Sequence, residues 1–368
     1  MKKYRVLEIA SMNNRAGIEN FIMNVLRNID HDKCQIDFLY TTNLIGPYDD
    51  EILSYGCNIY RIEPTGRSIT MIKKHNDSLK KLLLDINPDV VHIHGNTAIG
   101  CLDSIVAKRL KINKIIVHSH NSSCGGLRSK ILHYLFKPLI NFSATDKLGC
   151  SIAACEWMFY RNNFKVVNNG IDTSKYKYCK KTDSSIREKY NLFDYKIIGH
   201  VGRFTLQKNH GFIIDTFKIV HERDKNTKLM LIGSGETKIE VIKKIEMLNL
   251  SDSVLILDEV YNINEIMQSF DLFVLPSKWE GLGIVLIEAQ AVGIPCIVSE
   301  SIVEEAKITD LVHTVSLKKG PKEWADKVLN LITSDKKDYR EELIDSGYDI
   351  RITSNFLENV YSGETKDE

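Results

Sequence analysis

The chain has 368 residues, of which 43% are hydrophobic, with 49 Lys and Arg residues against 48 Asp and Glu residues. This length exceeds what one hydrophobic core normally supports and predicts two domains. The net charge of +1 gives no overall field that would attract nucleic acid, so we expect no nucleic-acid partner.

The cysteines and the N-terminus indicate a cytoplasmic protein. Eight cysteines are scattered without C-x-x-C pairs, and the chain enters an apolar segment without a signal-peptide core. No apolar stretch reaches the roughly 20 residues that a membrane-spanning helix needs. Any membrane contact would therefore be peripheral, at the inner face of the cell membrane.

The first half of the chain alternates short apolar runs with longer amphipathic runs. Such alternation is typical of a mostly parallel sheet covered by helices. Strands are predicted near 4-10, 35-40, 90-94, 114-118 and 164-167, and helices near 18-29, 69-85, 97-110 and 129-141.

Helix 129-141 carries basic residues beside leucines and aromatics. It could rest on an anionic membrane surface. A core-packed helix with basic outer positions is the preferred interpretation.

After a polar stretch at 173-190 the alternation restarts, which predicts the α/β class with two doubly wound Rossmann-like domains facing a central cleft. The domains are predicted to cover 1-172 and 173-345. The segment 336-361 is charged and helical in pattern. The pattern leaves two alternatives: the segment closes the second domain, or a helix at 346-368 packs back on the first domain. The second set of strands is predicted near 196-201, 228-232, 254-257, 272-275 and 295-298.

The segment 271-292 is the most informative of the second domain. It is predicted to form a buried strand, a loop and an apolar helix that begins near Gly283. Glu288 interrupts that helix and needs hydrogen-bond donors, which a ribose diol would supply. Glu280 lies in the preceding turn, so free helix N–H groups suited to a pyrophosphate fall between the two carboxylates. Alternatively, Glu280 is a solvated loop residue and Glu288 an ordinary capping or salt-bridge group.

The segment 197-210 places two cations after a strand. Arg203 offers a planar fork and Lys208 a point charge, and together they could neutralise a diphosphate leaving group without a metal. A solvated turn is the alternative. A further glycine-rich turn, LIGSGE at 231-236, lacks the glycine that a dinucleotide fingerprint requires at 238, where the chain has Lys238.

Four histidines occur at the ends of two predicted strands, with period-two spacing that puts each pair on one face. A binding site or satisfied core histidines would explain them; the core explanation is stronger for the first of each pair. We expect no zinc, because no H-E-x-x-H is present. The histidines are His92, His94, His118 and His120.

The D-x-D at 30-32 follows a helix and is interpreted as a solvated turn.

With these motifs in hand, the chain resembles the retaining glycosyltransferase family 4 of the GT-B fold, especially its bacterial exopolysaccharide and capsule branch. The resemblance covers nearly the whole chain. It is carried by EGLGIVLIEA at 280-289, GRFTLQKNH at 202-210, LIGSGE at 231-236 and NNGID at 168-172. The chain departs from the family at the first turn, where Ala16 precedes Gly17 in place of two glycines.

The resemblance implies that domain 1-172 lies on the acceptor side and domain 173-345 on the nucleotide-sugar side, and it implies a role for each matching residue. Arg203 and Lys208 would hold the donor diphosphate, Glu280 the transferred sugar and Glu288 the ribose. Gly283 and Ile284 would offer backbone N–H groups to the diphosphate. His120 would face the sugar, and His94 and Asn96 would lie on the acceptor side. Val260 would line the nucleobase pocket. Further contacts with the donor are implied for Gly17, Gly202, Gly233 and Leu282.

The implied reaction is metal-independent, retaining transfer of a hexose or N-acetylhexosamine from a nucleoside diphosphate sugar, with UDP the expected nucleotide. The acceptor would be a saccharide or lipid-linked saccharide of surface polysaccharide synthesis, and no cofactor is expected. A nucleotide-sugar 2-epimerase and a non-catalytic partner subunit that retains the fold are the alternatives.

Overall fold

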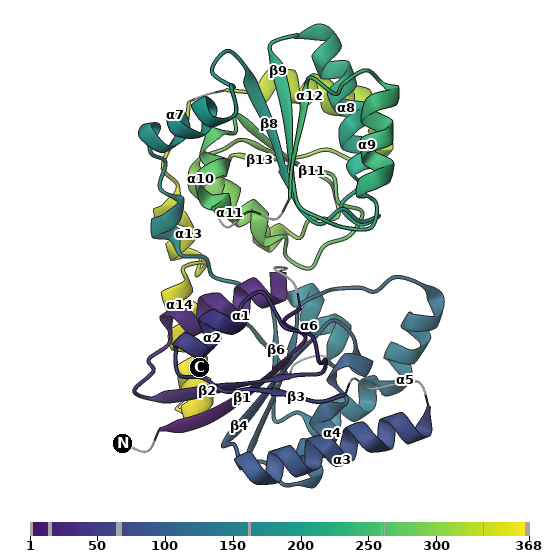
Figure 1. The fold of residues 1–368 in the computed structure, drawn as a ribbon, viewed down its shortest axis with the longest axis vertical. Helices are drawn as coiled ribbons and strands as arrows, with labels where there is room; N and C mark the ends of the chain where they lie inside the picture. Colours follow the sequence, from purple (N-terminus) through teal and green to yellow (C-terminus); the bar gives the residue numbers. More distant parts are fainter. Residues whose placement is uncertain are drawn as a thin grey trace. The chain divides into compact units, whose positions relative to one another are not determined.

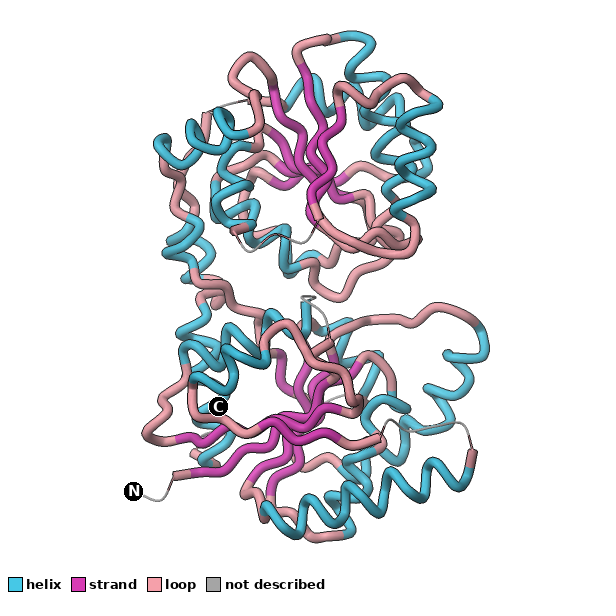
Figure 2. Tube along the Cα trace, viewed as in Figure 1, coloured by secondary structure: helices cyan, strands magenta, loops and turns pink. Residues whose placement is uncertain are grey.

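The computed structural model describes residues 3–13, 17–63, 68–160, 163–258, 260, 262–333 and 335–364. The chain divides into two compact units, and each contains one parallel sheet between helices (Figures 1 and 2). Unit 1 comprises residues 1–170 and 350–368, and unit 2 comprises residues 171–349. The predicted α/β class and the two Rossmann-like sheets are confirmed.

Unit 1 has the strand order β3-β2-β1-β4-β5-β6-β7, and each described strand pair is parallel. The chain returns to this unit with its last helix, which packs on the first. The strands are β1 (Tyr4–Ala10), β2 (Cys34–Tyr40), β3 (Ile59–Arg61), β4 (Val90–Gly95), β5 (Lys114–Ser119), β6 (Asp146–Gly149) and β7 (Lys165–Val166), and the α-helices are α1 (Gly17–Asn28), α2 (Asp49–Ser54), α3 (Ile69–Ile86), α4 (Asp103–Arg109), α5 (Leu127–Ser143), α6 (Ile152–Met158) and α14 (Ile350–Ser362).

Strand β1 shows how the sequence divides the core of unit 1. Its alternate residues face opposite sides of the sheet, as the period of two requires. Val6 and Ala10 join the apolar cluster under α1 and α14, whereas Leu7 and Ile9 join the cluster on the other face. Glu8 therefore faces α1 and α14 from the middle of a buried strand.

Unit 2 has the strand order β10-β9-β8-β11-β12-β13. A core of apolar residues on β8, β9, β11 and the neighbouring helices holds its layers together. The strands are β8 (Lys196–Val201), β9 (Thr227–Ile232), β10 (Val254–Leu257), β11 (Leu272–Leu275), β12 (Cys296–Val298) and β13 (Val312–Thr314), and the α-helices are α7 (Lys180–Lys189), α8 (His210–Arg223), α9 (Lys238–Met247), α10 (Ile263–Ile266), α11 (Ile284–Val292), α12 (Gly320–Leu331) and α13 (Arg340–Asp345).

Two expected helices are divided in the structure. The segment predicted as a helix at 97-110 forms a 3-10 turn at Ala98–Cys101 followed by α4. The segment 336-361 forms α13 and α14 with a break at Gly347, whose φ of 80° lies in the left-handed region. Glycine adopts this region at little cost, and the chain turns there between two helices.

One side of helix α5 packs on the core, as the preferred interpretation of the segment 129-141 expects, but its outer positions are not only basic. His133, Ile140 and Ser143 are buried, but a second apolar face of the same helix is exposed. The core of the unit can cover only one side of a helix that is apolar on two sides. Within the described ranges, every helix is too short or too polar to span a bilayer. The exposed apolar residues of α5 are Leu127, Ile131, Tyr134, Leu135, Leu139 and Phe142.

Candidate active site

The strand order of unit 2 places β8 beside β11, although two further strands separate them along the chain. The connections run in opposite directions from this point, and ligands of open α/β sheets bind at such a switch point, beyond the carboxyl ends of the strands. The loop 202–209 follows β8 and the loop 276–283 follows β11. Both segments singled out from the sequence therefore meet at one edge of the sheet.

The two loops are joined by hydrogen bonds along their length. The backbone N–H of Lys278 donates to the carbonyl of Gln207 at 2.8 Å, and the Gln207 side-chain amide donates to the carbonyl of Trp279 at 2.8 Å. Asn209 donates to the carbonyl of Pro276 at 3.2 Å. These bonds hold the side chains that follow β8 against those that follow β11.

Lys208 and Glu280 form the central contact of this site. The Lys208 Nζ lies 2.5 Å from the Glu280 Oε1, and the hydroxyl of Ser277 donates to the same oxygen at 2.8 Å. Glu280 is 7% exposed, so it is not a solvated loop residue. A largely buried carboxylate is stable only with such partners. The site thus holds a cation and a carboxylate whose charges a polar ligand could share.

The structure separates Arg203 from this pair. Its side chain is 59% exposed, and its nearest described ion-pair partner is the exposed Glu236, at 3.7 Å. Exposed pairs at this distance contribute little to stability. The guanidinium therefore remains available to an anionic ligand, whereas Lys208 is already engaged by Glu280.

Glycines shape the backbone of the site. Gly233 has a φ of 143°, and a Cβ atom there would lie 2.3 Å from the carbonyl oxygen of Gly202. This glycine thus allows the turn after β9 to pack on the turn after β8. Gly283 precedes α11 with a φ of 77°, in the left-handed region. Ile284 begins the helix, and Leu282 is 3% exposed, so its side chain belongs to the core.

Glu288 lies in the second turn of α11 and has a partner within the protein. Burial raises its pKa to about 7, and a hydrogen bond from Tyr176 opposes that rise. Tyr176 belongs to the 3-10 turn Thr173–Tyr176, which contacts α11. The sequence did not indicate this contact. A carboxyl group that titrates near neutral pH is a frequent feature of functional sites.

Two further residues implied as donor contacts are Val260, in unit 2, and Gly17, in unit 1. Val260, after β10, is partly exposed. Gly17 begins α1 in unit 1, is exposed and has open space around its Cα. Ala16 lies outside the described residues.

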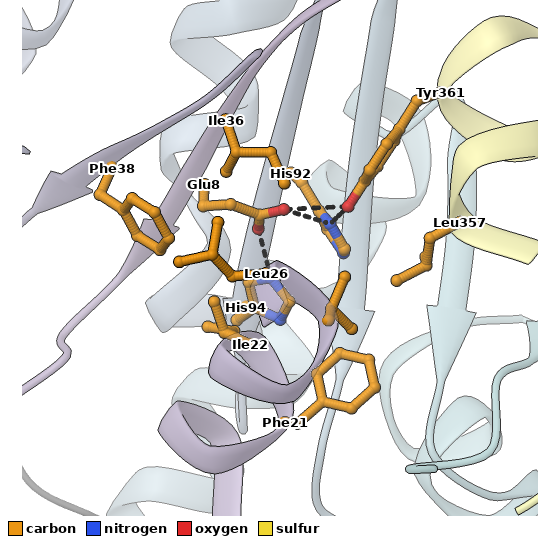
Figure 3. A pocket seen from close by; sticks show the side chains of 11 residues that line it. Glu8, Phe21, Ile22, Leu26, Ile36, Phe38, His92, His94, Leu357 and Tyr361 are labelled. Carbon is orange, nitrogen blue, oxygen red and sulfur yellow. Dashed lines mark hydrogen bonds and ion pairs between the residues drawn. The ribbon is translucent and has the colours of Figure 1, made fainter. Parts of the chain in front are cut away.

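The four histidines of unit 1 come together on one face of the sheet. Figure 3 shows two of them, His92 and His94, beside Glu8. Register pairs Glu8 with His92 and His94 with His118 across β1, β4 and β5. His94 Nε2 lies 2.7 Å from Glu8 Oε2, and His94 Nδ1 lies 2.8 Å from His120 Nε2. The His94 side chain is 1% exposed. His94 therefore lies behind His120 and does not form an exposed acceptor surface.

Glu8 is a residue of this cluster that sequence reasoning missed. The Tyr361 hydroxyl of α14 donates to Glu8 Oε1 at 2.9 Å, and His92 Nδ1 lies 3.2 Å from the same oxygen. Burial alone would raise the pKa of Glu8, but His92 and His94 hold it well below its usual range. The sequence did contain a signal for Glu8: a charged residue interrupts the apolar strand RVLEIA. The same kind of interruption identified Glu288.

The histidine cluster forms a hydrogen-bonded network. His92, His94 and His118 have ring nitrogens within 4.8 Å of one another, an arrangement that could hold an ion. However, the facing nitrogens already bond to each other or to Glu8. The pocket beside Glu8, His92 and His94 has a volume of about 10 Å³, enough for one water at most. The D-x-D at Asp30 is a turn between α1 and β2.

Asn96 follows β4 and is exposed, and its backbone carbonyl accepts a hydrogen bond from Trp157 Nε1 at 2.8 Å.

In unit 2, His200 Nδ1 donates to the Val274 carbonyl at 2.8 Å, and its Nε2 has no described partner. Burial lowers the pKa of His200 well below 6.5. It therefore contributes a neutral acceptor, not a positive charge, beside the loop of Lys208.

Comparisons with known proteins identify related families for both halves of the chain. Residues 183–349 match the family described as glycosyl transferases group 1, and residues 16–150 match the family described as glycosyl transferase 4-like. EpsF of Bacillus subtilis (strain 168), assigned as a glycosyltransferase, is 32% identical over 98% of this chain and 97% of its own.

Two further similarities extend over the whole chain. The capsular polysaccharide biosynthesis glycosyltransferase CapH of Staphylococcus aureus is 25% identical, over 98% of this chain and 99% of its own. The crystal structure of Anabaena HepE in complex with UDP and glucose has a TM-score of 0.79 at 16% identity, over 98% of this chain and all of that one. At that identity the structural likeness concerns the fold.

Proposed function

The chain belongs to the glycosyl transferases group 1 family, and we propose that it transfers a hexose or N-acetylhexosamine from a UDP-sugar to a saccharide or lipid-linked saccharide. The transfer retains the anomeric configuration, needs no metal and serves surface polysaccharide synthesis in the cytoplasm. The capsular relative supports the pathway, and the UDP complex of the structural neighbour supports the nucleotide.

The contact between Lys208 and Glu280 carries this proposal. It joins residues 72 positions apart at the switch point of the sheet, before the N-terminus of α11. The helix N–H groups and Arg203 suit a diphosphate, and Glu280 suits sugar hydroxyls. A departing diphosphate would then be stabilised by Lys208 and Arg203, a largely electrostatic form of catalysis.

An activity assay tests the proposal directly. UDP- and GDP-sugars are screened by thermal shift, and the best ligand is assayed with saccharide and lipid-linked saccharide acceptors. Lys208→Ala and Glu280→Ala should each abolish most transfer, while Lys218→Ala, an exposed lysine of α8, should not. Unchanged transfer in the first two variants would refute the assignment of the site.

The comparisons favour a transferase over the nucleotide-sugar 2-epimerase, and the assay separates these reactions. An epimerase would release an isomeric sugar nucleotide without an acceptor. A transferase would form free UDP in proportion to the glycosylated acceptor. A non-catalytic subunit would bind the nucleotide and produce neither.

We also propose that α5 rests on an anionic membrane, where a lipid-linked acceptor would lie. Its exposed residues recur every three or four positions, and Leu127 and Phe142 are 77% and 74% exposed. The helix has three basic residues and no acidic one. Apolar side chains on a basic helix bind the interface of anionic bilayers.

Vesicle sedimentation tests this placement. The wild-type protein should sediment with vesicles that contain phosphatidylglycerol and much less with phosphatidylcholine alone. Leu135→Glu should lose binding, whereas Leu53→Glu on α2, which replaces a leucine of similar exposure, should retain it. Equal binding of both variants would refute a role for α5.

A further inference from the structure

We propose that Glu8 and His94 are positioning residues that hold His120 in one tautomer, with an unprotonated Nδ1 that accepts a hydrogen bond from a ligand hydroxyl. The inference rests on the proposed function, whose substrates carry sugar hydroxyls, and on the family resemblance, which implies that His120 faces the sugar. It adds a specific chemical state of that histidine and the two buried residues that maintain it.

The hydrogen bonds determine this tautomer in sequence, from Glu8 through His94 to His120. Glu8 is ionised and can only accept, so His94 Nε2 must carry the proton in their 2.7 Å contact. A neutral imidazole has one N–H, so His94 Nδ1 is an acceptor. The 2.8 Å contact with His120 Nε2 then requires that His120 donates through Nε2. Its Nδ1 is left without a proton, and it is a buried polar atom without a partner in the described part of the chain.

The second oxygen of Glu8 keeps this direction from reversing. Glu8 Oε1 accepts from the Tyr361 hydroxyl and lies 3.2 Å from His92 Nδ1. The carboxylate therefore meets donors on both oxygens and has no proton to return to His94. Tyr361 comes from α14 and thus links the last helix to the network (Figure 3).

The surroundings make His120 a hydrogen-bond acceptor and not a general base. Burial lowers its pKa well below 6.5, and it lowers the pKa of His94 to about 4. The charged imidazolium is therefore disfavoured in both rings. A neutral Nδ1 without a proton can accept from a hydroxyl, but it cannot donate to a phosphate oxygen. This chemistry suits a sugar hydroxyl and excludes the diphosphate as the partner of Nδ1.

Long-range ¹H–¹⁵N NMR of protein labelled at histidine reads each tautomer directly. In the wild-type protein at neutral pH, His94 and His120 should both be protonated at Nε2 and unprotonated at Nδ1. A His120 ring that carries a proton on Nδ1 would overturn the proposal. This measurement needs no variant, no substrate and no activity.

Glu8→Gln provides the matched perturbation. Its amide oxygen should stay with Tyr361 and His92, which leaves the NH₂ group facing His94. His94 Nε2 would then accept, and the protons on both His94 and His120 would move to Nδ1. Tyr361→Phe removes a donor from the other oxygen of Glu8 and should keep the wild-type tautomers; the same reversal in that variant would overturn the role of the carboxylate.

The kinetic consequence separates this inference from the proposed function. Glu8→Gln should lower kcat/KM for sugar transfer by about tenfold, the loss of one hydrogen bond. Its affinity for UDP should not change, because Arg203, Lys208 and Glu288, to which the diphosphate and ribose contacts are assigned, lie in unit 2. An unchanged kcat/KM with reversed tautomers would refute the positioning role. A wild-type protein that binds no UDP-sugar would refute the proposed function and leave the tautomer result standing.

Discussion

Replacement of Glu288 by glutamine tests whether this carboxylate binds the ribose. The pKa of Glu288 is about 7 because burial disfavours its charged form. At pH 6 about a tenth of such a group is ionised, and at pH 8 about nine tenths. Ribose hydroxyls donate more strongly to a carboxylate than to a neutral acid. The affinity of the wild-type protein for UDP should therefore rise about tenfold from pH 6 to pH 8.

Isothermal titration calorimetry at the two pH values measures this change. Binding near pH 7 should also release a proton, seen as a dependence of the measured heat on the buffer. Both effects should vanish in Glu288→Gln and persist in Glu246→Gln, which replaces an exposed glutamate of α9. An equal rise in affinity for wild type and Glu288→Gln would refute the ribose contact.

The same variant has a predicted effect on stability. Between pH 4.5 and about 7 the folded chain binds more protons at Glu288 than the unfolded chain does. The free energy of unfolding from this group therefore falls as the pH rises through that window, by at most about 3 kcal/mol. Relative to wild type, Glu288→Gln should gain stability from pH 5 to pH 8 in denaturant unfolding. A constant difference between the two proteins would refute the raised pKa.

Further predictions concern the loops of unit 2, a glycine of unit 1 and the dependence of the reaction on a metal. Lys208→Met should lower kcat about 100-fold, measured as UDP release with acceptor present. Lys218→Met is the control. If Lys208→Met lost less kcat than Arg203→Met, the central role of Lys208 would be contradicted. Gly233→Ala should destabilise the protein by about 2 kcal/mol in urea unfolding, because its φ of 143° and the Gly202 carbonyl leave no room for a Cβ. Gly17→Ala, with open space around it, should be neutral. Transfer should continue in EDTA, and its loss with rescue by a divalent cation would refute the metal-independent mechanism.

The sequence alone was sufficient for the class of fold and for much of the candidate site in unit 2. Local patterns carried this information: apolar runs of strand length, amphipathic helices and glycines at turns. The spacing of Glu280 and Glu288 around a helix start depends only on residues close in the chain. Their environments did not follow from spacing, and the pairing of Glu280 with Lys208 required the order of β8 and β11.

Features of unit 1 that depend on distant partners appeared only in the tertiary structure. Period-two spacing placed His92 and His94 on one face, but the register of β1 brought Glu8 beside them. Helix α14 returns from the end of the chain to supply Tyr361. The sequence of α5 contained its apolar residues, yet exposure depends on what the rest of the unit covers. Local propensity thus determined the elements, whereas strand order and packing decided which side chains met.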